Sequence, residues 1–318
     1  MGNSKKMTGV YIDTMFARVL HGAILLMSIV LSAHAQQAPA AHLRGHITIS
    51  ELPQGVELRP PTGISRADLT AQLERQPAVI LDGAVLEITA PAAGSSRSLM
   101  MKRLELLNNS RIVTNGTNLE IYAGTTVSQG GGILAFESAT KGAAVAGQNG
   151  ETGLDAGTVV IDTQLAQNNV LYVNLSGQSG EDGGPGVAGP PGAQGPRGEN
   201  GADHIFDCAH GAGNGGAGSQ GGAGGAGGNG GAGGAGGQLI LRGQVAAQRS
   251  QVEFSAPGGN GGRGGPGGAG GVGGPGGPGG NKTTYCRSGN NGITGPKGNN
   301  GADGSPGVRG KDGRILAD

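Results

Sequence analysis

The sequence predicts a fold that is mostly β and irregular. It predicts an N-terminal β-solenoid-like unit followed by a bundle of four antiparallel polyglycine-II helices with an inserted strand pair. Glycine supplies 71 of the 318 residues and recurs every third position in four blocks of similar length. Short β-prone runs fill the residues before the first block. An apolar, glycine-poor stretch separates the second block from the third.

The four glycine blocks have two compositions. Blocks 177–203 and 289–315 are G-x-y triplets, whereas blocks 211–237 and 258–281 are mostly G-G-x. A period of three forms a continuous face only on a helix with three residues per turn, and such a helix has no internal hydrogen bonds. Its backbone must therefore bond to neighbouring segments. A G-x-y block has one bare glycine face and can pack against one neighbour, whereas a G-G-x block has two such faces and can pack between two neighbours. The order of the blocks therefore predicts a sheet-like stack with the G-x-y blocks at its edges.

Two short connectors carry the only cysteines of the chain. Residues 204–210 join the first two blocks and contain Cys208, and residues 282–288 join the last two and contain Cys286. If the chain reverses at each connector, both connectors lie at the same end of the stack. We therefore expect a Cys208–Cys286 disulfide, which would stabilise the fold by about 4.5 kcal/mol in the chain-entropy model. Two free thiols are the alternative.

The residues before the blocks predict one short helix and a series of strands. Residues 65–76 have Ser65 as a helix N-cap and apolar spacing of helical period. Short β-prone runs separated by Gly, Asn and Ser follow, a spacing typical of all-β folds. Stacked solenoid rungs are expected, with a β-sandwich as the alternative. The predicted strands are 78–81, 85–89, 103–107, 111–114, 118–123, 133–136, 158–161 and 170–175.

An internal repeat connects the two halves of the chain. Residues 157–176 align with residues 237–255 when one residue is deleted, and each stretch precedes a glycine block. The repeat predicts that 238–255 forms a strand pair added to the N-terminal unit. A smaller glycine stretch, 147–156, is either a short fifth helix or a loop. The alignment matches Val159, Ile161, Val173 and Leu175 with Leu239, Leu241, Val252 and Phe254.

The N-terminus indicates export. Basic residues precede an apolar run at 19–31, and Ala33 and Ala35 supply a small-x-small cleavage site. The run has 13 residues, against the roughly 20 needed to span a bilayer, so cleavage is favoured over a membrane anchor. The expected domains are a signal peptide at 1–35, a β-rich domain at 36–176 and a glycine-repeat domain at 177–315 with a β-insert at 238–256. The expected location is extracellular or at the cell surface, or the periplasm of a Gram-negative cell, with no stable membrane insertion after cleavage.

Composition and motifs exclude several functions. The chain has 22 basic and 22 acidic residues and no basic stripe, which argues against nucleic-acid binding. His204, Asp207, Cys208 and His210 lie close together, but a disulfide would use the cysteine, and no metal-binding spacing supports them. We expect no metal, no cofactor and no enzymatic activity. A carbohydrate-active enzyme would need converging carboxylates, and the predicted strands carry no such cluster.

The glycine blocks resemble two groups of known proteins. The G-G-x runs, such as 221–237, resemble the polyglycine-II bundles of springtail glycine-rich antifreeze proteins and of phage tail-fibre tip adhesins. The G-x-y blocks are similar to bacterial collagen-like proteins. The resemblance covers 177–315 and concerns pattern alone, so no functional residue carries over. In the adhesins, loops at the far end of the bundle recognise the receptor, and the resemblance therefore implies an end-on display of the connectors.

We expect the connectors to form a contact surface. The sequence favours a secreted, non-catalytic structural or adhesion protein that presents a disulfide-clamped tip to a surface glycan or a protein receptor, because aromatic residues dominate binding energy. Alternatively, Phe206 and Tyr285 only cap the disulfide. Further alternatives are a collagen-like trimer of the extracellular matrix or cell surface and an ice-binding protein using alanines 223, 226, 232 and 235. The expected contact residues are His204, Ile205, Phe206, His210, Lys282, Tyr285 and Arg287.

Overall fold

Two parallel β-sheets organise the described chain. The structure is a computed structural model that describes residues 40–89 and 95–318. The predicted signal peptide, residues 1–35, lies outside these residues. Among the residues that are described, no helix has the length and apolar character needed to cross a bilayer.

The larger sheet has seven strands in the order β1-β3-β5-β7-β9-β13-β15, and every neighbouring pair is parallel. Its last two strands come from the glycine-rich half of the chain, and residues 40–318 form one compact unit. The sheet therefore continues past the domain boundary expected at residue 176. The strands are β1 (Ala41–Leu43), β3 (Ala78–Asp82), β5 (Ser96–Leu107), β7 (Asn118–Gln129), β9 (Thr158–Leu165), β13 (Gln238–Arg242) and β15 (Arg314–Ala317).

The smaller sheet has six strands in the order β14-β10-β8-β6-β4-β2, and it too is entirely parallel. The chain alternates between the sheets, since each of these strands follows a strand of the larger sheet. The strands are β2 (His46–Thr48), β4 (Val85–Glu87), β6 (Arg111–Val113), β8 (Gly132–Leu134), β10 (Leu171–Asn174) and β14 (Val252–Ser255).

The apolar core is one cluster drawn from both sheets. Leu81 and Leu106 of the larger sheet and Ile112 of the smaller are fully buried in it. Residues that pair in register on neighbouring strands point to the same face of the sheet and form rows, because side chains alternate with a period of two. One row runs from the N-terminal half into the strands beside the glycine blocks and consists of Leu119, Val159, Leu239 and Ile315.

Asparagines occupy the turns between strands of different sheets. Asn108 and Asn109 lie between β5 and β6, Asn115 lies between β6 and β7, and Asn168 lies between β9 and β10. All four have positive φ angles, between 49° and 60°. Asn tolerates this left-handed conformation better than other residues with a side chain, so these positions allow the chain to turn from one sheet to the other.

Helix α2 (Arg66–Leu73) covers part of the larger sheet. Ser65 caps its first turn, because the Ser65 hydroxyl accepts a hydrogen bond from the Asp68 backbone N–H at 3.1 Å. Leu69 and Leu73 pack in a small second cluster that includes residues of β5 and β7. The remaining elements are α3 (Gln244–Ala247), the 3-10 helices η1 (Ile49–Glu51) and η2 (Arg249–Gln251), and the short pair β11 (Ala202–Asp203) and β12 (Cys208–His210).

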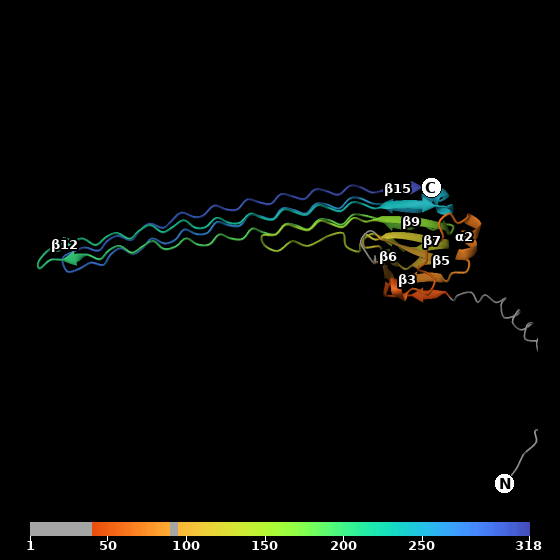
Figure 1. The fold of residues 1–318 in the computed structure, drawn as a ribbon, viewed down its shortest axis with the longest axis horizontal. Coiled ribbons are helices and arrows are strands. Elements are labelled where there is room, and N and C mark those ends of the chain that lie inside the picture. The colour runs from red at the N-terminus through yellow and green to blue at the C-terminus, as the bar shows by residue number, and fades with distance from the viewer. Residues whose placement is uncertain (1–39, 90–94) are drawn as a thin grey trace, which may run out of the picture. The chain divides into compact units, whose positions relative to one another are not determined.

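The glycine blocks are extended segments with neither α-helix nor strand hydrogen bonding. We refer to residues 177–201, 211–237, 258–281 and 289–313 as glycine segments 1 to 4. They run beside one another between the sheets and β12 (Figure 1). Backbone bonds join five of the six pairs of segments, and none in the described residues joins segments 1 and 4. Examples are Gly213 N to Glu199 O at 2.8 Å, Gly180 N to Asn260 O at 2.8 Å, Gly259 N to Gly234 O at 2.8 Å, Gly218 N to Ile293 O at 3.0 Å and Gly292 N to Gly277 O at 2.8 Å.

The fold class expected from the sequence is wrong. Instead of a solenoid-like unit and a bundle of four antiparallel polyglycine-II helices, the structure has two parallel sheets of seven and six strands. Only α2 and α3 are α-helices among the described residues. The prediction treated the glycine blocks as the organising elements. The organising elements are the sheets, because the stretches that flank the blocks pair as their strands β13, β14 and β15.

Two finer features of that prediction are also wrong. The inserted stretch 238–255 adds two strands to the N-terminal unit, as expected, but they do not pair with each other, since β13 and β14 belong to different sheets. The segments are not a sheet-like stack, because segment 1 bonds directly to segment 3 and segment 2 to segment 4.

Residues 147–156 are also extended, and the Gly150 N–H donates to the Asn229 carbonyl at 2.8 Å.

Individual strands and the helix were predicted correctly. Each of the eight predicted strands overlaps an observed one, and the predicted helix at 65–76 contains α2. The repeat alignment is correct in its first half, where Val159 pairs with Leu239. It is wrong by two residues in its second half, where Val173 pairs with Phe254 rather than with Val252. Here α3 and η2 replace a simple turn, and their length cannot be inferred from a one-residue deletion.

Gly221→Ala tests the close approach of the glycine segments. An ideal Cβ at Gly221 would lie 2.0 Å from the Gly271 carbonyl oxygen, whereas one at Gly211 would have nothing within 4 Å. The obstructing atom is backbone and cannot rotate away, so we expect Gly221→Ala to destabilise the protein by about 3 kcal/mol. The matched variant Gly211→Ala should be neutral or slightly stabilising. Denaturant unfolding measures both, and equal unfolding midpoints for the two variants would contradict the prediction.

Asp312 predicts an acid-sensitive contribution to stability. A hydrogen bond from the Gly258 N–H, at 2.8 Å, and then one from Arg309 lower the pKa of Asp312 below its ordinary 3.8. A lowered folded-state pKa stabilises the protein fully above the ordinary value and loses that effect as pH falls through the folded value. We therefore expect Asp312→Asn to be less stable than the parent near neutral pH, with the difference shrinking below pH 3.8. Thermal unfolding of the parent and of Asp312→Asn across this pH range measures the difference, and a difference that does not change with pH would contradict the prediction.

Candidate functional site

A disulfide joins the two connectors, as predicted. Cys208 and Cys286 are bonded, their Cα atoms lie 5.0 Å apart, and 78 positions separate them in the sequence. Cys286 is buried, with 5% of its surface exposed. We call residues 202–210 and 282–288 together the connector tip. The disulfide ties the end of glycine segments 1 and 2 to the end of segments 3 and 4.

The first connector is a small hairpin. Strands β11 and β12 pair antiparallel, with Ala202 opposite His210 and Asp203 opposite Cys208. The turn between them is closed by hydrogen bonds from the His204 N–H to the Asp207 carbonyl and from the Cys208 N–H to the Asp207 carboxylate, both at 2.7 Å. The hairpin therefore holds Ile205 and Phe206 at its turn.

Asp203 holds the second connector against the first. Its carboxylate accepts hydrogen bonds from the Thr283 hydroxyl, from the Thr284 N–H at 3.0 Å and from the Tyr285 N–H at 3.2 Å. The Thr283 hydroxyl oxygen also accepts from the Cys286 N–H at 3.0 Å. One carboxylate thus organises the turn beside the disulfide. This role was not inferred from the sequence, because Asp203 lies in a different connector from its partners.

All seven residues expected to make contacts are exposed. They come from both connectors and lie around the disulfide: His204, Ile205, Phe206, His210, Lys282, Tyr285 and Arg287. Phe206 is 84% exposed and Ile205 is 82% exposed. The alternative that Phe206 caps the disulfide is therefore wrong, because a capping ring would be largely buried. Tyr285 is 49% exposed and is partly covered.

The connector tip carries charged as well as apolar side chains, with Lys282 and Arg287 balanced by Asp203 and Asp207. No ion pair involves Lys282 or Arg287 within the described residues, whereas the Asp203 and Asp207 carboxylates already accept backbone hydrogen bonds. Of the residues that could have suggested a metal site in the first connector, Cys208 is bonded in the disulfide. No group of three His, Cys, Asp or Glu residues in the described chain is arranged to hold a metal ion.

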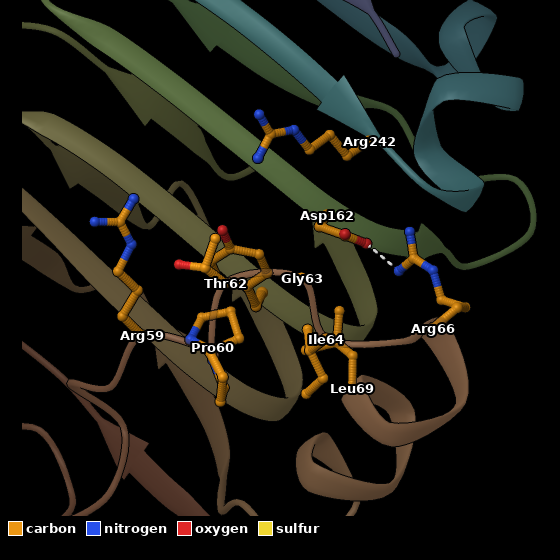
Figure 2. Close-up of a pocket in the computed structure, with 11 residues that line it drawn as sticks. Arg59, Pro60, Thr62, Gly63, Ile64, Arg66, Leu69, Asp162 and Arg242 are labelled. Atoms are coloured by element: carbon orange, nitrogen blue, oxygen red, sulfur yellow. Dashed lines mark hydrogen bonds and ion pairs between the residues drawn. The ribbon is translucent and has the colours of Figure 1, made fainter.

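A second candidate site lies between α2 and the larger sheet. It is a pocket of about 410 Å³ lined by three arginines from two separate parts of the chain. Figure 2 shows Arg59, Arg66 and Arg242 around the loop that leads into α2. Its lining residues are Arg59, Pro60, Pro61, Thr62, Gly63, Ile64, Arg66, Leu69, Tyr122, Asp162 and Arg242.

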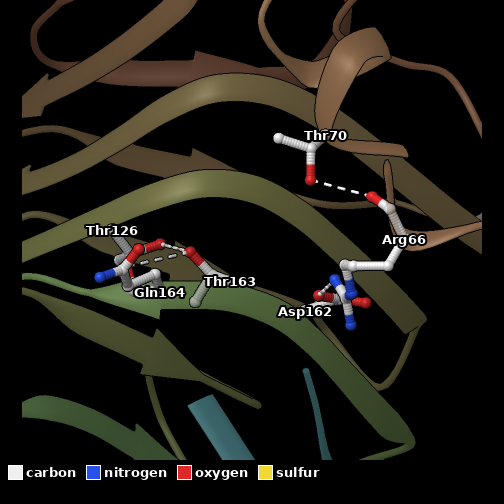
Figure 3. Close-up of polar contacts among 6 residues, drawn as sticks. All are labelled: Arg66, Thr70, Thr126, Asp162, Thr163 and Gln164. Carbon is white, nitrogen blue, oxygen red and sulfur yellow. Dashed lines mark hydrogen bonds and ion pairs between the residues drawn. The ribbon is translucent and has the colours of Figure 1, made fainter. Parts of the chain in front are cut away.

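All three arginines are ion-paired, and Arg242 contacts Asp318 at 3.9 Å. Arg66 contacts the buried Asp162 at 2.5 Å, and Arg59 contacts Glu120 at 3.0 Å. Figure 3 shows the Arg66–Asp162 contact joining α2 to β9, and the Arg66 carbonyl also accepts a bond from the Thr70 hydroxyl at 2.9 Å. In the same region Thr126 and Thr163 share a buried hydrogen bond of 2.9 Å. The Arg66–Asp162 contact fastens α2 to the sheet, and the threonine pair joins β7 to β9.

The chemistry available in this pocket is limited. Its lining contains one carboxylate, that of Asp162, which is paired with Arg66. Burial, and then the negative charge of Glu120, raise the pKa of Tyr122 above its ordinary value. Glycoside hydrolysis ordinarily requires two carboxylates with separate roles. The pocket lining does not provide that pair. The sequence offered no signal for this pocket, because residues 59–66, Asp162 and Arg242 are distant in the chain.

Comparisons with known proteins identify no relative. No protein-family model matches the chain, no curated protein matches it, and no solved structure matches its fold. The resemblance to polyglycine-II and collagen-like proteins therefore rests on the sequence pattern alone.

Removing the disulfide is predicted to loosen the connector tip. The bond closes a loop of 78 residues, so replacing both cysteines by serine should lower the free energy of unfolding by up to about 4.5 kcal/mol. Amide exchange should accelerate most around Thr284 and Tyr285, whose N–H groups bond to Asp203. Denaturant unfolding and hydrogen exchange measure the two effects. Reductant provides the control, because it should destabilise the parent and leave the double serine variant unchanged. A parent that is as stable with reductant as without it would contradict the prediction.

Proposed function

We propose that this chain is a secreted, non-catalytic structural or adhesion protein whose connector tip contacts a surface glycan or a protein receptor. Its glycine segments serve as the support, and the two sheets serve as the base of that support. The location that accompanies this proposal is extracellular or at the cell surface, with the periplasm as an alternative.

The exposure of Phe206 is the observation that carries the proposal. A phenylalanine that is 84% exposed beside an isoleucine that is 82% exposed loses the free energy that burial would supply. The disulfide and the two hydrogen bonds to Asp207 hold the turn that carries these side chains. A pre-organised aromatic side chain binds with little loss of conformational entropy, which favours a contact function.

The alternatives receive less support. The amides of the glycine segments bond to carbonyls of the same chain, which leaves them unavailable for a collagen-like trimer. An ice-binding face would need a flat row of exposed small residues. Ala223 and Ala226 are exposed, but Ala232 and Ala235 are half-buried, and their carbonyls accept bonds from the 147–156 stretch.

The test measures binding to arrayed surface glycans and to immobilised extracellular proteins. We expect the parent protein to bind a member of one array. Replacing the exposed phenylalanine, Phe206→Ser, should weaken that binding at least about tenfold, which corresponds to about 1.4 kcal/mol. Val308→Ser is the matched control, because Val308 is a similarly exposed apolar residue, at 72%, in glycine segment 4 outside the connector tip.

Absence of binding in both arrays would contradict the proposal. Equal binding of every array member by the parent and Phe206→Ser would also contradict it, because none of the binding would then involve the connector tip. Unfolding curves of Phe206→Ser and Val308→Ser distinguish a loss of binding from a loss of fold.

A further inference from the structure

The outer face of the smaller sheet carries a row of residues from six strands in register. The row crosses β2, β4, β6, β8, β10 and β14 and consists of His46, Val85, Arg111, Gly132, Tyr172 and Glu253. Successive members are about 4.8 Å apart, the spacing of strands in a sheet. Arg111, Tyr172 and Glu253 are exposed. The parallel register thus places a cation, an aromatic ring and an anion on one line.

Gly132 leaves room in this row for the Tyr172 side chain. An ideal Cβ at Gly132 would lie 3.2 Å from the Cβ of Tyr172 and 3.3 Å from its Cδ1 atom, so the tyrosine side chain leans over the glycine. Tyr172 remains 40% exposed, and Val170 beside it is 54% exposed. The cavity at this place has a volume of about 660 Å³ and is lined by Asn109, Arg111, Gly130, Gly131, Gly132, Leu134, Val170, Tyr172 and Glu253.

The charged groups of this cavity are free, unlike those of the pocket beside α2. Neither Arg111 nor Glu253 makes a side-chain hydrogen bond or an ion pair in the described part of the chain. Three strand spacings separate them, about 14 Å between their backbones, and the tyrosine lies between them. The cavity therefore offers one strong donor, one strong acceptor and an apolar floor, with no net charge from these two groups.

We propose that this cavity binds a neutral saccharide. The tyrosine ring, Val170 and Leu134 would contact the C–H face of a sugar ring. The Arg111 guanidinium would donate to its hydroxyl oxygens, and the Glu253 carboxylate would accept from its hydroxyl protons. Concave sites with apolar walls and a few converging polar groups are typical of small-ligand binding. A neutral ligand is favoured because the carboxylate would repel an acidic sugar while the guanidinium attracted it.

Isothermal titration of the whole protein tests the proposal. The probes are maltose, cellobiose, lactose and diacetylchitobiose, with digalacturonate as the acidic comparison. We expect at least one neutral disaccharide to bind with a Kd in the millimolar range or tighter. Tyr172→Ala should weaken binding at least about tenfold, whereas Tyr172→Phe, which keeps the ring, should stay within about threefold of the parent. Glu253→Gln should weaken binding and retain the unfolding midpoint.

The Phe206→Ser variant separates this site from the connector tip. It should bind the neutral disaccharide as the parent does, and Tyr172→Ala should keep whatever binding the connector tip has. The inference is overturned if no neutral disaccharide binds, if only digalacturonate binds, or if Tyr172→Ala binds as tightly as the parent. Tyr172→Phe keeps the test decisive if the alanine variant unfolds, because a Tyr172→Phe variant that folds but does not bind would also overturn it.

Discussion

The parallel register of the sheets is the constraint on which the rest of this structure depends. Strands β9, β13 and β15 stack Val159, Leu239 and Ile315 in one row, and β10 pairs with β14 in the second sheet. Every glycine segment is joined directly to one of these strands at its sheet end. The segments therefore start side by side at a strand-like spacing. From there glycine amides reach neighbouring carbonyls, because no Cβ stands between the backbones.

The two ends of the glycine segments are secured by different chemistry. At the sheet end, apolar burial between two sheets fixes the register, and this interaction is strong because it is contiguous over many residues. At the other end, the described residues form no apolar core. A covalent bond between Cys208 and Cys286 and the carboxylate of Asp203 hold the connectors together instead. Exposed apolar groups such as Phe206 can then remain in water without compromising the fold.

The two proposed contact surfaces arise from this arrangement in different ways. The connector tip gathers Phe206 and Tyr285 from two connectors whose cysteines are 78 positions apart and are joined by a disulfide. In the sheet-face cavity one glycine, Gly132, interrupts a row of larger side chains and lets the Tyr172 side chain lie against the sheet. The first surface was foreseen because cysteine spacing and glycine blocks are visible in the chain. The second was not, because rows across a parallel sheet depend on a register that single strands do not reveal.

The sequence by itself determined the local structure: the β-prone runs, the Ser65 cap, the asparagine turns, the glycine period and the cysteine pairing. Each of these is a property of neighbouring residues or of spacing along the chain. Only the tertiary structure decided that two parallel sheets organise the fold, that β13 and β14 separate into different sheets, and that segment 1 bonds to segment 3. The physical reason is that β-pairing and backbone hydrogen bonding between distant segments are not encoded by local preference. The sequence alignment matched Val173 with Val252, whereas its observed partner is Phe254, two residues later. A shift of two residues keeps the same side chains facing the core, so the hydrophobic pattern alone could not exclude the wrong register.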